Sequence, residues 1–234
     1  MWRAAFVLAA CLAPCLAAPA AAQITSARYA DPTTRYDHAI LGDAVEWGTL
    51  VLHLAGGDRR RIVLPTSRVF EDIEPRLADL DGDGAPEVIA VETDLDRGAR
   101  LSVYGANGLI AATPFIGTRH RWLAPVGAAD LDGDGRMEIA YVDRPHLART
   151  LRIWRFANGQ LTQIAVSRGL TNHRIGDTIL SGGIRDCGTG PEMILADPGW
   201  TRLIAARLTG EGIVQRGLDL PATPRAFATA LACR

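Results

Sequence analysis

Two nine-residue stretches, DLDGDGAPE at residues 79–87 and DLDGDGRME at residues 130–138, stand out in the sequence. The second begins 51 residues after the first, and an apolar run follows each, VIAV in one case and IAYV in the other. A motif that recurs at a fixed period of this length indicates a repeat architecture, in which each copy is one supersecondary unit. The rest of the chain is therefore aligned on these two stretches.

Each stretch carries acidic side chains at its positions 1, 3, 5 and 9. Ca²⁺ takes about 6–8 oxygen ligands, which alternate residues of a tight loop can supply together. Glycines at 82, 84, 133 and 135 permit the positive φ angles of such a turn. A plain Asp-Gly turn is the alternative, but two copies in register favour a metal. The predicted Ca²⁺ ligands are the side chains of Asp79, Asp81, Asp83 and Glu87 with the carbonyl of Ala85, and the side chains of Asp130, Asp132, Asp134 and Glu138 with the carbonyl of Arg136.

Residues 1–22 are interpreted as a signal peptide. Arg3 supplies a positive charge, an apolar core follows, and three alanines precede Gln23 as a small-residue cleavage site. A lipoprotein anchored through Cys11 is the less favoured alternative, because only ten residues precede that cysteine. No later apolar run reaches the roughly 20 residues of a membrane helix. We therefore expect an exported protein, periplasmic or secreted, without a transmembrane segment and with its signal peptide removed.

The composition narrows the class of partner. The formal net charge is −1, so nothing favours nucleic acid as a ligand. All 25 basic residues are arginine. Export leaves two cysteines, Cys187 and Cys233, and an even pair in an oxidising compartment predicts a disulfide. We expect a monomer that binds a protein or carbohydrate ligand.

Alignment on the acidic loops divides the chain into units of four short strands rich in Val, Ile and Leu. The predicted strands are 75–81, 86–93, 99–105 and 108–115; then 125–132, 137–143, 149–156 and 160–167; then 179–186, 191–197, 201–208 and 212–220. The N-terminal part starts one strand late, with 37–43, 48–54 and 59–65, and its missing first strand is assigned to residues 225–234. This permuted order predicts an all-β fold, a four-bladed β-propeller closed by its C-terminal strand.

The acidic loop followed by an apolar strand resembles the FG-GAP/VCBS repeats of integrin-α-like β-propellers. The resemblance covers essentially all of residues 23–234, although the motif is intact only twice. In that family the loop lies between the first two strands of a blade and binds Ca²⁺, which implies the same role for the aspartates and glutamates named above. Both loops end in Glu where the family usually has Asp, a change that can alter the denticity or the affinity.

The last unit departs further from the pattern, since its loop at 184–192 keeps only Asp186 and Glu192 of the acidic positions. Two carboxylates are too few for a tight Ca²⁺ site. Cys187 lies in this loop, and Cys233 takes the matching place after the first strand of the neighbouring blade. A bridge between them is expected to lock the ring-closing strand.

Other residue types were weighed as ligands. Arg68, Arg121, Arg174 and Arg225 recur at spacings of 53, 53 and 51. They predict either a ring of arginines for an anionic ligand or, as the favoured alternative, packing against neighbouring blades. His120 and His173 share a repeat position, which marks them as structural residues. The other three histidines, His38, His53 and His146, have no metal-ligand spacing with one another. Packing is favoured over a carbohydrate platform for the tryptophans Trp47, Trp122, Trp154 and Trp200.

No nucleophile elbow, phosphate loop or Cys-His pair at catalytic spacing is present in the sequence. The sequence thus predicts a non-catalytic, calcium-binding binding or scaffold protein. The alternative is a hydrolase or lyase that acts on an anionic polysaccharide or phosphoester, with the arginines as a clamp. A deep pocket with perturbed carboxylates or histidines beside an arginine would favour the enzyme. A face of saturated side-chain pairs would favour the binding protein.

Overall fold

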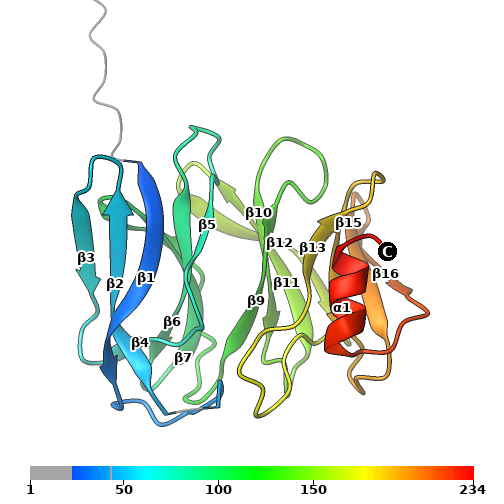
Figure 1. Ribbon diagram of the computed structural model, residues 1–234, viewed down its shortest axis with the longest axis horizontal. Coiled ribbons are helices and arrows are strands. Elements are labelled where there is room, and N and C mark those ends of the chain that lie inside the picture. Colours follow the sequence, from blue (N-terminus) through cyan, green and yellow to red (C-terminus); the bar gives the residue numbers. More distant parts are fainter. Residues whose placement is uncertain (1–22, 43) are drawn as a thin grey trace, which may run out of the picture.

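The computed structural model describes residues 23–42 and 44–234, and the signal peptide interpretation of residues 1–22 falls outside them. Apart from one helix, the regular secondary structure of the described chain is antiparallel β-sheet (Figure 1). We group the strands into four units. Unit A contains β1 (Ile24–Thr33), β2 (Glu46–Leu54) and β3 (Arg59–Val63). Unit B contains β5 (Arg76–Ala78), β6 (Glu87–Asp94), β7 (Gly98–Gly105) and β8 (Gly108–Ala112). Unit C contains β9 (Leu123–Ala129), β10 (Glu138–Asp143), β11 (Thr150–Ala157) and β12 (Gln160–Arg168). Unit D contains β13 (Gly183–Asp186), β14 (Pro191–Ala196), β15 (Leu203–Thr209) and β16 (Gly212–Gly217).

Within units B, C and D each strand pairs with the next one along the chain. Units A and B are joined by the short strand β4 (Arg68–Phe70), which pairs with β2 on one side and with β6 on the other. They form one eight-stranded sheet, whereas units C and D are separate four-stranded sheets.

The units lie in a row (Figure 1), and their apolar faces are buried against one another. One core cluster joins unit A to unit B, a second joins B to C, and a third joins C to D. Alternation along β14 shows how a strand serves two neighbours. Met193 and Leu195 face the core shared with unit C, whereas Ile194 and Ala196 belong to a fourth cluster on the opposite face.

The strand predictions for units B, C and D are confirmed, and so are those for β2 and β3. The prediction of a strand at 37–43 is wrong, because the described part of this segment is irregular and the N-terminal unit instead begins with β1. This strand is an edge strand that pairs only with β2. An edge position tolerates its polar residues and Pro32 near the strand end, so its sequence lacks the apolar run used to find the others.

The prediction of a ring-closing C-terminal strand is also wrong. Residues 224–231 form helix α1 (Pro224–Leu231), with Thr223 as N-cap and Pro224 in its first turn. Both residues are typical of helix starts, and this signal outweighs the apolar content of the segment. The helix covers the outer face of unit D, at the end of the row opposite unit A (Figure 1). Among the described residues, none of the four core clusters joins unit A to unit D.

The helix α1 has eight residues. Within the part of the chain that the structure describes, no helix is long and apolar enough to cross a membrane.

Substitution of Phe227 tests the role of α1. Its side chain is buried between the helix and unit D, at 4% exposure. We expect Phe227→Ala to lower the free energy of unfolding in urea by about 3–5 kcal/mol, the range for buried aromatic truncations. The exposed Arg225→Ala on the same helix is the control, with an expected change within about 0.5 kcal/mol. Equal effects of the two substitutions would contradict a stabilising role for the helix.

Candidate metal centre

The first acidic loop connects β5 to β6 and folds around its own carboxylates. The two side-chain oxygens of Asp79 accept hydrogen bonds from the backbone N–H groups of Gly82 and Gly84, at 2.8 and 3.0 Å. Both glycines have positive φ angles, 78° and 86°, which explains why glycine stands there. At the end of the loop, Oε2 of Glu87 accepts a hydrogen bond from the N–H of Leu80 at 2.8 Å.

The second loop, between β9 and β10, repeats this arrangement. Asp130 accepts hydrogen bonds from Gly133 and Gly135 at 2.8 and 2.9 Å, and Glu138 accepts one from Leu131 at 2.8 Å. The two nearly identical sequences therefore form the same turn, and the difference between the loops lies in what surrounds them.

In both loops three carboxylates converge. One oxygen from each of Asp79, Asp81 and Glu87 lies within 4.8 Å of the others, and the same holds for Asp130, Asp132 and Glu138. Clustered carboxylate oxygens are the donors that hard cations such as Ca²⁺ prefer, so each group could hold a metal ion. The carboxylates of Asp83 and Asp134 lie outside these closest groups. Their Oδ1 atoms accept hydrogen bonds from the N–H groups of Ala85 and Arg136, at 2.7 and 3.0 Å.

The charge of the first loop is not compensated by a protein cation among the described residues. The pKa of Glu87 is raised, mainly because burial disfavours its charged form, and the carboxylates of Asp81 and Asp83 add to the effect. A cation at this point would relieve both the burial cost and the repulsion.

In the second loop a guanidinium already occupies the space between the carboxylates. Arg155 donates from Nε to Glu138 at 2.7 Å and from its terminal nitrogens reaches Asp132 at 2.6 Å and Asp134 at 3.1 Å. Three of the carboxylates predicted as Ca²⁺ ligands thus form ion pairs with one arginine. Charge-assisted bonds of this kind satisfy the oxygens that a metal would need.

Strand pairing explains why only one loop has this arginine. Arg155 lies directly across from Glu138 in the ladder between β10 and β11. When the register of Val88 with Tyr104 is continued by one residue, the position across from Glu87 is Gly105. Glycine has no side chain to reach the loop, and a cavity of about 260 Å³ lies beside Glu87 and Gly105. The residue on the third strand therefore distinguishes the two loops.

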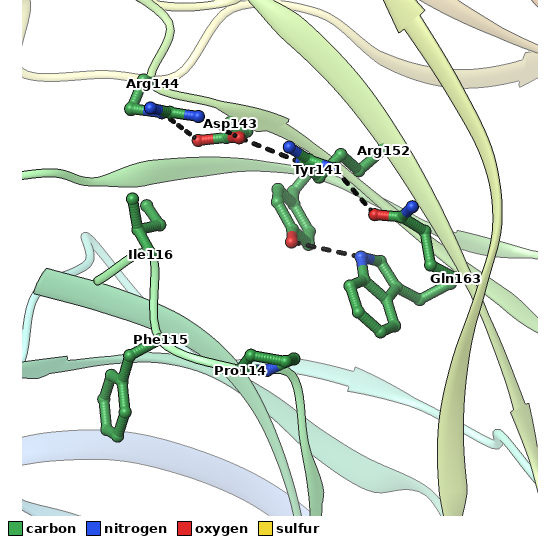
Figure 2. Close-up of a pocket in the computed structure, with 9 residues that line it drawn as sticks. Pro114, Phe115, Ile116, Tyr141, Asp143, Arg144, Arg152 and Gln163 are labelled. Atoms are coloured by element: carbon green, nitrogen blue, oxygen red, sulfur yellow. Dashed lines mark hydrogen bonds and ion pairs between the residues drawn. The ribbon is translucent and has the colours of Figure 1, made fainter. Parts of the chain in front are cut away.

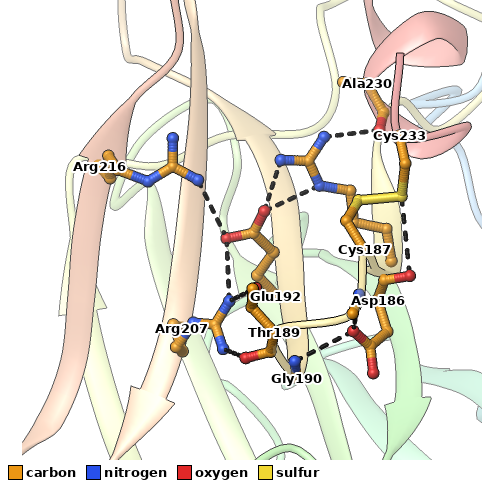
Figure 3. Close-up of a disulfide and its surroundings, with 11 residues drawn as sticks. Asp186, Cys187, Thr189, Gly190, Glu192, Arg207, Arg216, Ala230 and Cys233 are labelled. Carbon is orange, nitrogen blue, oxygen red and sulfur yellow. Dashed lines mark hydrogen bonds and ion pairs between the residues drawn. A yellow bond between two sulfur atoms is a disulfide. The ribbon is translucent and has the colours of Figure 1, made fainter.

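In unit D several arginines surround the glutamate of the corresponding loop (Figure 3). Glu192 forms ion pairs with Arg185, Arg207 and Arg216, the last two at 3.5 and 3.3 Å. Partial burial would raise the pKa of Glu192, but the hydrogen bond from Arg185 and the charges of the other arginines outweigh it, so this pKa is lowered. Asp186 still accepts hydrogen bonds from Gly188 and Gly190, which preserves the turn without the other carboxylates.

The predicted disulfide is confirmed. Cys187 in this loop is bonded to Cys233 (Figure 3). Its setting differs from the expectation, because Cys233 follows the helix α1 and not a closing strand. Arg185 also donates a hydrogen bond to the carbonyl of Ala230 at 2.6 Å. The bridge and this hydrogen bond together fasten the helix to the degenerate loop.

The four periodic arginines have different surroundings. Arg68 pairs with Glu92 at 2.9 Å, and the guanidinium of Arg174 lies 4.3 Å from the ring centre of Trp200. Arg225 is exposed on α1, and Arg121 lines a pocket together with histidines.

That pocket was not predicted from the sequence. It brings together His38, His120 and His146, with His173 hydrogen-bonded to His146. They lie far apart in the chain, and their loops meet only through the stacking of units. The repeat position shared by His120 and His173 was the available signal.

A different pocket, between residues 114–116 and strands β10 and β11, has its polar groups paired with one another (Figure 2). Asp143 accepts hydrogen bonds from Arg144 at 2.7 Å and from Arg152 at 2.9 Å. The indole N–H of Trp154 donates to the hydroxyl of Tyr141 at 3.1 Å. The polar side chains of this surface are thus largely satisfied by one another.

Comparison with known proteins agrees with the repeat. Residues 79–141 match the family model described as an FG-GAP-like repeat, so the chain carries this repeat across units B and C. No curated protein is significantly similar in sequence. Among solved structures, the crystal structure of the exotype rhamnogalacturonan lyase YesX is similar, with a TM-score of 0.48 and 17% sequence identity over 84% of this chain and 47% of that one. The chain spans about half the length of that lyase.

Removal of the disulfide tests its fastening role. The two cysteines are 46 residues apart, and closing a loop of that size contributes roughly 4 kcal/mol in the chain-entropy model. We expect Cys233→Ser to lower the free energy of unfolding by about 2–4 kcal/mol and to speed amide exchange in α1, while β6 and β10 stay protected. Uniform exchange across all units in the variant would contradict a local role.

Proposed function

We propose that this chain is an exported, calcium-binding protein built of β-propeller-like repeats, with units A to D as successive blades in an open row, and that it acts as a non-catalytic binding or scaffold protein. The observation that carries the metal assignment is the uncompensated cluster of Asp79, Asp81 and Glu87, within the segment that matches the FG-GAP-like repeat. Export is supported by the disulfide, since such bonds persist in oxidising compartments.

The proposed role of the metal is structural. The ion would hold the hairpin between β5 and β6 closed by neutralising the carboxylates of the first loop. We propose that Arg155 takes the place of a metal in unit C, and that the three arginines around Glu192 do so in unit D. We therefore propose one Ca²⁺ per chain, bound by Asp79, Asp81 and Glu87, with Asp83 and the carbonyl of Ala85 available to complete the shell.

The hydrolase or lyase is retained as a second candidate because one observation favours it. Glu71 is fully buried, and burial raises its pKa to about 8; it is hydrogen-bonded to His38, which lies in the same pocket as Arg121. Release of new ends from an anionic polysaccharide by the wild type, and its loss in His38→Ala, would support this candidate. Absence of products leaves the binding function.

A thermal shift tests the metal site. Calcium that binds only the folded state should raise the free energy of unfolding by about 2.7 kcal/mol at 100 times its dissociation constant. We expect the thermal midpoint to rise on addition of Ca²⁺ to chelator-treated protein. Asp81→Ala should abolish the rise, whereas the matched control Asp132→Ala should retain it. A rise that survives Asp81→Ala would place the ion elsewhere.

Exchange of one residue between the units tests the role of Arg155. Calorimetric titration should give one Ca²⁺ for the wild type, two for Arg155→Gly and none for Gly105→Arg. In the last variant a Cβ atom would meet the terminal methyl group of Ile110 at 2.9 Å, a flexible neighbour that can move. Two ions bound to the wild type, or one ion in both variants, would contradict the proposal that an arginine replaces the metal in unit C.

A further inference from the structure

Four loops that are distant in sequence meet around a pocket of about 220 Å³. They contain residues 38–40, 120–122, 144–147 and 175. The first of them belongs to the segment after β1, which runs along the lower edge of the molecule in Figure 1. The next two precede β9 and follow β10, so the pocket lies at the edge of unit C opposite its acidic loop.

His38 presents one ring nitrogen that has no partner among the described residues. Its Nδ1 lies 2.5 Å from Oε1 of Glu71, and the other oxygen of Glu71 accepts a hydrogen bond from Thr93. Burial raises the pKa of Glu71 to about 8, and burial together with the charge of Arg121 lowers that of His38 to about 4. The raised pKa of Glu71 keeps a proton between its carboxyl group and Nδ1, whichever of the two atoms holds it, so Nε2 carries the other N–H of His38.

His146 presents the opposite character. His173 Nε2 lies 2.8 Å from the carbonyl of Asp177, and a carbonyl can only accept, so this nitrogen carries the proton. In neutral His173 the Nδ1 atom is then an acceptor, and it receives the Nε2–H of His146 at 2.9 Å. Burial lowers the pKa of His146 to about 4, so this ring is neutral as well. Its Nδ1 remains as an acceptor.

Two arginines line the pocket, Arg121 and Arg144. Arg144 is paired with Asp143, which also pairs with Arg152. Arg121 donates to the backbone carbonyl of His120 at 3.0 Å, but no carboxylate of the described chain lies within 4 Å of it. Its guanidinium retains hydrogen-bonding capacity and a full positive charge for a ligand.

The remaining walls are apolar. Trp122, Ile40 and Leu147 line the pocket beside the polar groups. The volume is below the roughly 300–1,000 Å³ of sites for drug-sized ligands, so the space suits a small molecule. A single lining arginine without a carboxylate partner matches a singly charged anion better than a phosphate dianion, and the apolar walls match an organic body.

We propose that this pocket binds a small organic carboxylate, whose oxygens accept hydrogen bonds from Arg121 and His38 while its apolar part packs against Trp122. A hydroxyl group on the ligand would donate to Nδ1 of His146. This inference gives a ligand class to the proposed binding function and rests on it, but it does not depend on the metal site in unit B.

Nuclear magnetic resonance provides a local readout. The indole N–H of Trp122 donates to the carbonyl of Glu71 at 2.9 Å, so its signal reports on the pocket. The signals of Trp47, Trp154 and Trp200 serve as internal references. Titration with isobutyrate and with lactate should shift the Trp122 signal alone, and lactate should bind more tightly because of its hydroxyl group. Inorganic phosphate should bind more weakly than either.

Variants of Arg121 test whether its guanidinium binds the carboxylate. Arg121→Gln should weaken the binding of lactate about tenfold or more, as expected for loss of a charged hydrogen bond, and Arg121→Lys should retain part of it. Arg225→Gln, on the exposed face of α1, is the matched control. Unchanged affinity in Arg121→Gln, no shift of the Trp122 signal with either carboxylate, or tighter binding of phosphate would each overturn the proposal. The Ca²⁺-induced thermal shift of Arg121→Gln should equal that of the wild type, which separates failure of this pocket from failure of the metal site.

Discussion

The structure depends on the compensation of a buried glutamate at the beginning of the second strand in each of units B, C and D. In the first two of these units its carboxylate accepts the backbone N–H that closes the acidic loop, as for Glu87 and Glu138. A buried carboxylate costs several kcal/mol unless a cation is close. Unit D supplies three arginines around Glu192, unit C supplies Arg155, and unit B offers a loop with the geometry of a metal site.

The two edges of the sheets carry different kinds of loop. The acidic loops and the disulfide loop lie at the edge where first strands lead into second strands, and there they fasten each hairpin. The loops around His38, Arg121 and His146 lie at the opposite edge of unit C, where the segment between β1 and β2 meets the connections between units B, C and D. The hairpin loops and the histidine pocket thus lie at opposite edges of the sheets, while α1 covers the last sheet.

Sequence patterns predicted the strands of units B to D because the acidic loops fix their spacing, and they predicted the bond between Cys187 and Cys233. They did not predict β1, an edge strand with little apolar content, or α1, because the prediction followed its apolar composition and not its capping residues. The sequence alone did not show that Arg155 and Gly105 distinguish the two acidic loops, since their effect depends on which residue lies across the ladder. The histidine pocket was missed for a similar reason, because stacking of the units brings its loops together.

The central claim is that arginines neutralise the loops of units C and D, whereas a metal ion neutralises the loop of unit B. Anomalous diffraction from crystals of the mature protein grown with a lanthanide in place of Ca²⁺ tests it most directly, because the ion itself is located. We expect one peak, between Asp79, Asp81 and Glu87, with Arg155 still bonded to Glu138. A peak of equal height between Asp130 and Glu138, with Arg155 displaced, would contradict the claim.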